Sequence, residues 1–207
     1  MKKALILAVL LIFCGCAQKT EKDILKQAMD YYQKKMFDKA IAEFSKIIKQ
    51  KPYEPSTYFL RGLAYFDQGN YDRAISDYNM VLAINPDFAE GYINRGNAYN
   101  KKGQWEEAIS DYDKAIWIDP SNALAYNNRG DTFQKKGDLE QAITDYNTAI
   151  GINPDEGLTY YNRAHANFLK QEFDKAWQDS QKAQALGYKD DPESFLEKLK
   201  EARPQEK

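Results

Sequence analysis

Histidine and cysteine are almost absent from this chain of 207 residues, which has one histidine and two cysteines. The histidine is His165, and the cysteines are Cys14 and Cys16. The sequence has no glycine-rich phosphate loop and no cluster of metal ligands at a recognised spacing. We therefore expect a protein that is not an enzyme and that holds no cofactor and no metal ion. His165 is expected to be a surface or contact residue rather than a catalytic one.

An excess of charge of one sign is also lacking. The chain has 29 lysines and arginines against 31 aspartates and glutamates, which gives a net charge of -2. No basic stripe is concentrated enough to bind nucleic acid, so nucleic acid is excluded as a partner. The 15 tyrosines and 10 phenylalanines are many, but most of them recur at fixed positions of a repeat, which indicates a structural core.

A unit of 34 residues runs five times through the chain without an insertion. The units are residues 21–54, 55–88, 89–122, 123–156 and 157–190. Position 20 is always alanine, position 8 is glycine or alanine, positions 11 and 24 are aromatic in four units, and position 32 is proline in four. Constant positions that step by three or four residues lie on one face of an α-helix. Each unit is therefore predicted to be a hairpin of two closely packed helices.

The ends of these helices are also marked in the sequence. Gly69, Gly103 and Gly137 stand at position 15, where a left-handed residue can end the first helix. Position 18 is acidic in every unit, which suits the positive end of a second helix. The proline at position 32 prevents that helix from continuing into the next unit.

These positions resemble the tetratricopeptide repeat family, whose pattern has an aromatic residue at 4, a small one at 8, tyrosine at 11, alanine at 20, an aromatic residue at 24 and proline at 32. Units two, three and four match this pattern, with Phe133 in place of tyrosine at position 11 of unit four. The first unit departs at Ile24 and Lys35, and the fifth at Asn167, Ser180 and Tyr188, as expected of terminal units. The resemblance implies an all-α fold, a right-handed α-solenoid of five helix-turn-helix units.

A capping helix is predicted after the repeats, over residues 191–203, followed by a tail of residues 204–207. The helix would begin at the sequence Asp191-Pro192-Glu193, with proline in its first turn. Its apolar face would consist of Phe195, Leu196 and Leu199. This face is expected to cover the last hairpin.

The first twenty residues have a different character. Residues 4–13 are apolar without interruption and follow two lysines, as in a secretion signal. Ten helical residues span about 15 Å, half of the hydrocarbon thickness of a bilayer. The segment that ends at Cys16 resembles the bacterial lipobox. This resemblance implies a lipoprotein signal peptide over residues 1–15, lipidation of Cys16 with acyl chains such as palmitate, and a tether over residues 16–20.

A lipid on Cys16 would anchor the chain to a membrane, because two or three acyl chains together hold firmly. The residue after the cysteine is Ala17, not aspartate. By resemblance to proteobacterial lipoproteins, this indicates the bacterial cell envelope, at the outer membrane facing the periplasm. An ordinary cleaved signal and an uncleaved anchor remain the alternatives.

In the family that these repeats resemble, the first helices line a concave face through positions 2, 5, 6, 9, 12 and 13. The resemblance implies a groove for a peptide segment of a protein partner. The groove would be apolar in units one and two and rich in amides in units three and four. The residues selected for it are Phe59, Leu63, Phe66, Asn94, Asn97, Asn128, Asp131, Tyr161, Asn162 and His165.

Two polar columns need separate interpretation. Asn94, Asn128 and Asn162 occupy position 6, where each amide could both donate to and accept from a peptide backbone. Bonds between neighbouring units, or inheritance from duplication, explain them equally well. Position 7 is arginine in units two to five and position 23 is acidic throughout, which predicts a ladder of bidentate ion pairs between helices. The arginines of this ladder are Arg61, Arg95, Arg129 and Arg163.

The sequence therefore predicts a membrane-anchored scaffold that binds a segment of a protein partner. Envelope assembly, secretion and regulation of cell-wall enzymes are the processes that the resemblance suggests. A self-assembling structural protein, forming homo-oligomers, is one alternative. An envelope protein that binds peptidoglycan or another glycan through its tyrosines and asparagines is the other.

Overall fold

The computed structural model describes residues 20–189 and 193–202 of the chain. Within these residues every regular element is an α-helix, and each predicted 34-residue unit contains one pair. The first helices of the pairs are α2 (Glu21–Gln33), α4 (Pro55–Asp67), α6 (Ala89–Lys101), α8 (Ala123–Lys136) and α10 (Gly157–Leu169). The second helices are α3 (Phe37–Gln50), α5 (Tyr71–Ile84), α7 (Trp105–Ile118), α9 (Leu139–Ile152) and α11 (Phe173–Ala185). The last helix is α12 (Glu193–Ala202).

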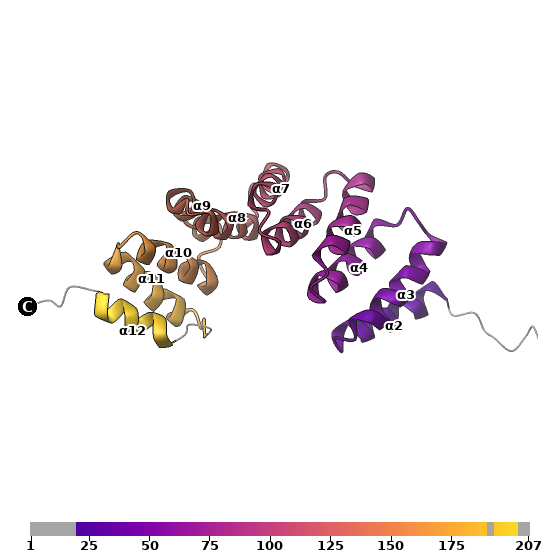
Figure 1. Ribbon diagram of the computed structural model, residues 1–207, viewed down its shortest axis with the longest axis horizontal. Coiled ribbons are helices and arrows are strands. Elements are labelled where there is room, and N and C mark those ends of the chain that lie inside the picture. Colours follow the sequence, from indigo (N-terminus) through magenta and orange to yellow (C-terminus); the bar gives the residue numbers. More distant parts are fainter. Residues whose placement is uncertain (1–19, 190–192, 203–207) are drawn as a thin grey trace, which may run out of the picture.

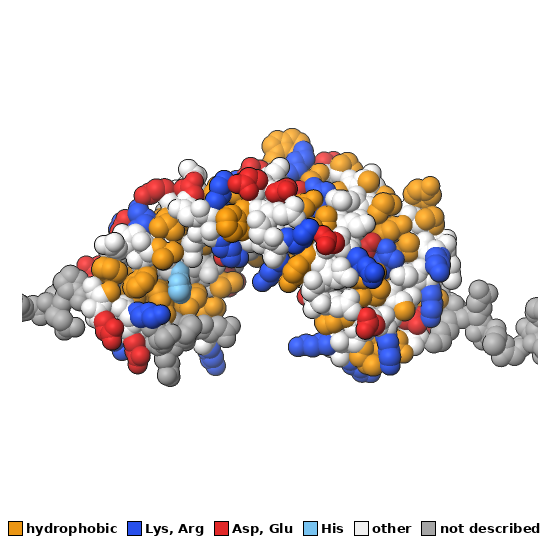
Figure 2. All heavy atoms as spheres, in the orientation of Figure 1, with side chains coloured by type: hydrophobic (Ala, Val, Ile, Leu, Met, Phe, Trp, Pro, Cys, Tyr) orange, Lys and Arg blue, Asp and Glu red, His pale blue; other side chains and the backbone are white. Residues whose placement is uncertain are grey.

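The helix pairs stack into an arch that runs from α2 at one end to α12 at the other (Figure 1). First helices of neighbouring units touch directly, between α4 and α6, α6 and α8, and α8 and α10. The hollow beneath the arch is open between its two arms (Figure 2). The predicted all-α solenoid of five units is therefore confirmed, and α12 closes its carboxyl-terminal end as expected.

Several predicted segments lie outside the described residues. They are the signal peptide, Cys16 with most of the tether, residue 190 at the end of unit five, residues 191, 192 and 203 of the capping helix, and the tail. Thr20, which was predicted to end the tether, is the N-cap of α2, and its hydroxyl accepts a hydrogen bond from the backbone N–H of Asp23 at 3.2 Å. Among the helices of the described residues, none is both long and apolar enough to cross a membrane.

Each of the three central pairs is held together by a tyrosine ring at position 24 that lies against glycine at position 8. Tyr112 and Tyr146 are fully buried. A Cβ atom added to Gly96 or Gly130 would stand 2.8 Å from the nearest carbon of these rings. Glycine at position 8 therefore lets the two helices of these units approach closely around a tyrosine ring, whereas unit one combines Ala28 with the buried ring of Phe44.

The predicted helix ends are confirmed, and the left-handed turn at position 15 also forms in the two units that have no glycine there. The second helices of the first four units end two residues before the proline at position 32, because the residue before proline is displaced from the helical region. Gly69, Gly103 and Gly137 adopt positive φ angles of 84, 74 and 92°. Lys35 and Gln171 adopt φ angles of 56 and 63° at the same position, although this conformation costs about 1 kcal/mol for a residue with a Cβ. The hairpin therefore imposes the turn even where glycine is missing.

The predicted arginine ladder is confirmed, and each arginine has a further partner that was not predicted. Arg95 donates from Nε and Nη2 to the carboxylate of Asp111 at 2.8 and 2.6 Å, within its own unit. Its Nη1 donates to Oδ1 of Asn79 at 2.6 Å, on the second helix of the preceding unit. Each such arginine thus joins three helices from two units, and we call this arrangement the arginine staple. The other three staples have Arg61 with Asp77 and Ser45, Arg129 with Asp145 and Asp113, and Arg163 with Asp179 and Asn147.

Two helical glycines with different surroundings should respond to alanine in opposite ways. Gly130→Ala places a methyl group against the buried ring of Tyr146, so we expect a loss of about 1–3 kcal/mol of unfolding free energy from overpacking. The methyl group added by Gly151→Ala meets no atom within 4 Å. This variant should therefore raise the unfolding free energy by up to about 1 kcal/mol, because alanine favours the helix. Urea denaturation of the two variants measures both effects. Equal shifts in the same direction would contradict the close approach at position 8.

Candidate binding groove

The groove is the inner face of the arch, formed by the first helices. The predicted groove residues of unit two are half-buried on α4. Phe59 contacts the ring of Phe88 with centroids 5.3 Å apart, and the ring of Tyr78 at 5.9 Å. Phe66 contacts Tyr71 at 5.4 Å. These rings therefore pack within unit two while Phe59 and Phe66 keep part of their surface exposed.

An apolar cavity of about 290 Å³ opens beside Phe59. Groove positions 2, 5 and 6 of α4 contribute Ser56, Phe59 and Leu60, and the remaining walls include Val81 and Phe88. Val81 and Phe88 were not predicted as part of the groove, because they belong to α5 and to the connection after it. The sequence did contain one signal for Phe88. Position 34 is phenylalanine only in unit two, whereas three other units have glutamate or asparagine at that position.

The amides of units three to five form a hydrogen-bonded chain that we call the amide network. Asn162 donates to Oδ1 of Asn127 at 3.0 Å, and Asn127 donates to Asn128 at 3.3 Å. Asn128 donates to Oδ1 of Asn97 at 3.0 Å, and the hydroxyl of Tyr112 donates to the same oxygen at 2.7 Å. Two of these bonds join neighbouring units, which is one of the two alternatives to peptide binding considered for the asparagine column.

The other two polar residues predicted for the groove also have partners in the protein. Asp131 accepts hydrogen bonds from Asn100 at 3.1 Å and from Lys135 at 2.6 Å. Asn94 donates to the backbone oxygen of Glu90 at 2.8 Å, within its own helix. These contacts reduce the number of polar groups that the middle of the groove offers to a peptide.

The carboxyl-terminal end of the predicted groove is covered by α12. The ring of His165 stacks on Phe195 with centroids 3.8 Å apart, and the ring of Tyr161 lies 5.7 Å from the same phenylalanine. Tyr161 and His165 were expected in the open groove, and the structure instead places them in the contact between α10 and α12. The capping helix was predicted, but the sequence did not show which face of α10 it would cover.

Two side chains at groove positions, one on α10 and one on α2, have pKa values that are shifted from their ordinary values. Burial and the nearby amine of Lys198 lower the pKa of His165. Burial, together with a hydrogen bond to the carboxylate of Asp67, raises the pKa of Tyr32 to about 12. Both side chains therefore stay uncharged at neutral pH, as contacts between packed helices require.

Comparison with protein families agrees with this geometry. The family model described as TPR repeat matches residues 62–103 and 96–137, and the model described as Tetratricopeptide repeat matches residues 123–156. The chain belongs to the tetratricopeptide repeat family. These matches cover most of units two to four, whose sequences follow the pattern of the tetratricopeptide repeat most closely.

Solved structures of other tetratricopeptide repeat proteins resemble most of the arch. A crystal structure of MamA is 26% identical, covers 77% of this chain and 94% of its own, and superposes with a TM-score of 0.70. TTC0263, a thermophilic TPR protein of Thermus thermophilus, is 20% identical over 88% of this chain and 98% of its own, with a TM-score of 0.68. The pilF protein of Pseudomonas aeruginosa is 16% identical over 88% of this chain and 85% of its own, with a TM-score of 0.75. No curated protein sequence matches the chain.

The groove of this tetratricopeptide repeat protein is suited to holding a polypeptide. Within residues 20–189 and 193–202, no group of three or more histidine, cysteine, aspartate or glutamate side chains is arranged to hold a metal ion. The open apolar cavity lies near the amino-terminal end, the amide network lies in the middle, and α12 closes the other end. The groove therefore offers its clearest contacts on unit two.

His165 should make the docking of α12 depend on pH. Its pKa is lowered in the fold, so the unfolded chain binds the proton more readily, and stability is full above about pH 6.5 and falls below it. We expect the thermal midpoint to drop between pH 7.5 and 5.5, a range that lies above the ordinary pKa values of carboxylates. The chain has one histidine, so His165→Phe, which keeps a ring against Phe195, should flatten this profile. An unchanged decline in that variant would show that another group is responsible.

Proposed function

We propose that this protein is a non-enzymatic, membrane-anchored scaffold that binds a segment of a partner protein in the groove of the arch. The apolar cavity beside Phe59 carries the proposal. It combines a volume of about 290 Å³ with walls from α4, α5 and Phe88, and it opens at groove positions of unit two. A peptide segment lying along the groove would insert one apolar side chain here, and burial of such a side chain yields about 1.5–3 kcal/mol.

The proposed partner segment is apolar at its anchor and polar along the rest of its length. In the amide network, three of the four amide nitrogens already donate and three of the four amide oxygens already accept, so we assign it to holding units three to five in register rather than to the main contact. The specificity of binding would come from the partner's side chain that enters the cavity, in agreement with the general observation that a few buried anchors dominate binding.

The proposed location is the bacterial cell envelope, at the outer membrane facing the periplasm. The support is the sequence alone: an apolar stretch over residues 4–13 followed by the lipobox-like segment that ends at Cys16. A scaffold held there would place its partner near the membrane surface, in envelope assembly, secretion or regulation of cell-wall enzymes.

Blocking the cavity tests the groove. Ser56 is exposed and lines the cavity, so Ser56→Trp should fill its mouth without removing a core residue. Photo-crosslinking in the native cell from an adjacent position such as Leu63 should trap a partner, and Ser56→Trp should reduce that product at least tenfold. Ser76→Trp, at an exposed serine on α5, is the matched control and should leave the product unchanged. Equal yields from the two tryptophan variants would refute the cavity as the anchor, and a product that consists of two copies of this chain would favour self-assembly.

The two cysteines provide a matched test of the anchor. Cys16→Ser removes the proposed acceptor of the lipid and should move the protein out of the membrane fraction or leave its signal uncleaved. Cys14→Ser should change neither, because Cys14 would leave with the signal peptide. Mass spectrometry of the mature amino terminus measures both outcomes, and an unmodified cysteine on a membrane-bound wild-type chain would contradict lipidation.

A further inference from the structure

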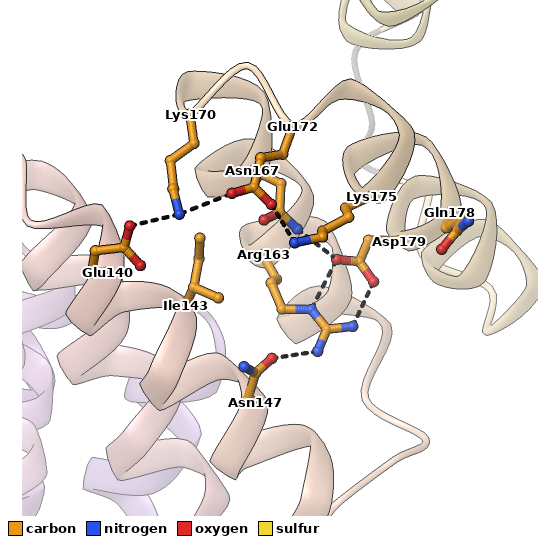
Figure 3. A pocket seen from close by; sticks show the side chains of 10 residues that line it. All are labelled: Glu140, Ile143, Asn147, Arg163, Asn167, Lys170, Glu172, Lys175, Gln178 and Asp179. Carbon is orange, nitrogen blue, oxygen red and sulfur yellow. Dashed lines mark hydrogen bonds and ion pairs between the residues drawn. The ribbon is translucent and has the colours of Figure 1, made fainter.

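A second cavity, of about 450 Å³, lies between α9 of unit four and α11 of unit five, with side chains of α10 lining it (Figure 3). Its lining includes Ile143 from α9, Arg163 and Asn167 from α10, and Lys175 from α11. Arg163 and Asn167 stand at positions 7 and 11, whereas Tyr161 and His165 stand at positions 5 and 9 and face α12. The cavity and the groove therefore lie on opposite sides of α10.

The repeat itself shows what is missing from this cavity. Position 11 is aromatic in the first four units, where it is Tyr31, Tyr65, Tyr99 and Phe133, but it is Asn167 in unit five. In unit two, the ring of Tyr65 lies 5.8 Å from the guanidinium carbon of Arg61, at position 7. The same ring lies 5.6 Å from the guanidinium carbon of Arg73, at position 19. The ring thus occupies a space between two cations.

Unit five retains both cations without the ring. Arg163 and Lys175 stand at positions 7 and 19 of this unit, and both line the cavity. Asn167 is 3% exposed and does not extend into the space, because its amide donates to the carboxylate of Asp179 at 3.2 Å. The cavity therefore corresponds to the place of an aromatic side chain that the other units supply from position 11.

The charges around the cavity favour an uncharged ligand. Three cations line it, and three carboxylates stand beside them: Arg163 pairs with Asp179, Lys170 with Glu140 and Glu172, and Lys175 with Glu172. An anion such as phosphate would meet these carboxylates, and a cation would meet the amines. A neutral ring can instead present its face to the cations, as Tyr65 does to Arg61 and Arg73 in unit two.

We infer that this cavity binds an aromatic side chain of a partner polypeptide, which takes the place of the missing ring at position 11. Tyrosine is the expected residue, because three of the four equivalent positions hold tyrosine. The volume of about 450 Å³ falls within the range of about 300–1,000 Å³ that is usual for small-ligand sites. This site is separate from the groove, so it adds a second contact for the partner or receives a different one.

The test uses the full chain in a mild detergent and N-acetyl-tyrosinamide as the probe. Titration should give saturable NMR shifts at the δ1 methyl of Ile143, with millimolar affinity. Asn167→Tyr restores the ring of the repeat, so it should abolish these shifts and raise the thermal midpoint. Lys175→Met keeps the length of an exposed side chain and removes one cation, so it should weaken binding several-fold without affecting folding.

Two further probes separate the possible ligands. N-acetyl-cyclohexylalaninamide has a similar size but no π-system and should bind several-fold more weakly than the tyrosine probe. Free tyrosine, which carries both charges of an amino acid, should bind no better than the blocked probe. The proposal is overturned if the wild-type chain shows no saturable shift, or if Asn167→Tyr binds the probe as well as wild type. A clear preference for free tyrosine would overturn the polypeptide as the occupant.

Discussion

The arginine staple is the interaction on which the geometry of the arch depends. A tetratricopeptide hairpin can pack on its neighbour in many registers, but each guanidinium must meet its own Asp carboxylate and a side chain of the preceding unit at the same time. The four aspartates are 3–7% exposed, and removal of one partner from such a buried pair typically costs about 3–5 kcal/mol. Position 7 of unit one is Gln27, not arginine, in agreement with this role, because the described residues hold no preceding second helix for a staple to reach.

Once the staples fix the rotation between units, the inner face has little freedom left. First helices touch one another along the middle of the arch, so polar side chains there must bond across units or stay unpaired in partly buried places. The amide network satisfies this requirement through Asn97, Asn127, Asn128 and Asn162. Because the amides of the groove bond to one another, recognition of a partner depends on the shape and the apolar surface of the groove. The cavity beside Phe59 is therefore the stronger candidate for the site that anchors a partner.

The periodicity of the sequence predicted the fold well, because small, aromatic and proline residues at fixed positions leave few ways to pack a hairpin. The arginine ladder was also predictable, since an arginine column facing an acidic column implies pairing. The hydrogen-bond partners of the asparagine amides could not be predicted, because an amide that can bond to a peptide backbone can equally bond to a neighbouring amide. The contact between His165 and Phe195 could not be predicted either: the pattern shows that α12 has an apolar face, but not where on α10 that face lies.

Unit five shows why departures from a repeat pattern need individual explanation. Its Ser180 replaces the buried ring at position 24, and within the described residues the Ser180 hydroxyl is buried without a hydrogen-bond partner, at a cost of about 1–3 kcal/mol. Phe195 and Leu199 of α12 are 4% and 0% exposed, and their burial contributes about 2 kcal/mol each, which offsets that loss. The last hairpin is thus stabilised from one side of α10 by α12, while the cavity at Asn167 remains open on the other. Both sides belong to α10, and the core of its unit is weakened at Ser180. Occupation of the cavity by a ring would therefore stabilise the same unit that α12 stabilises.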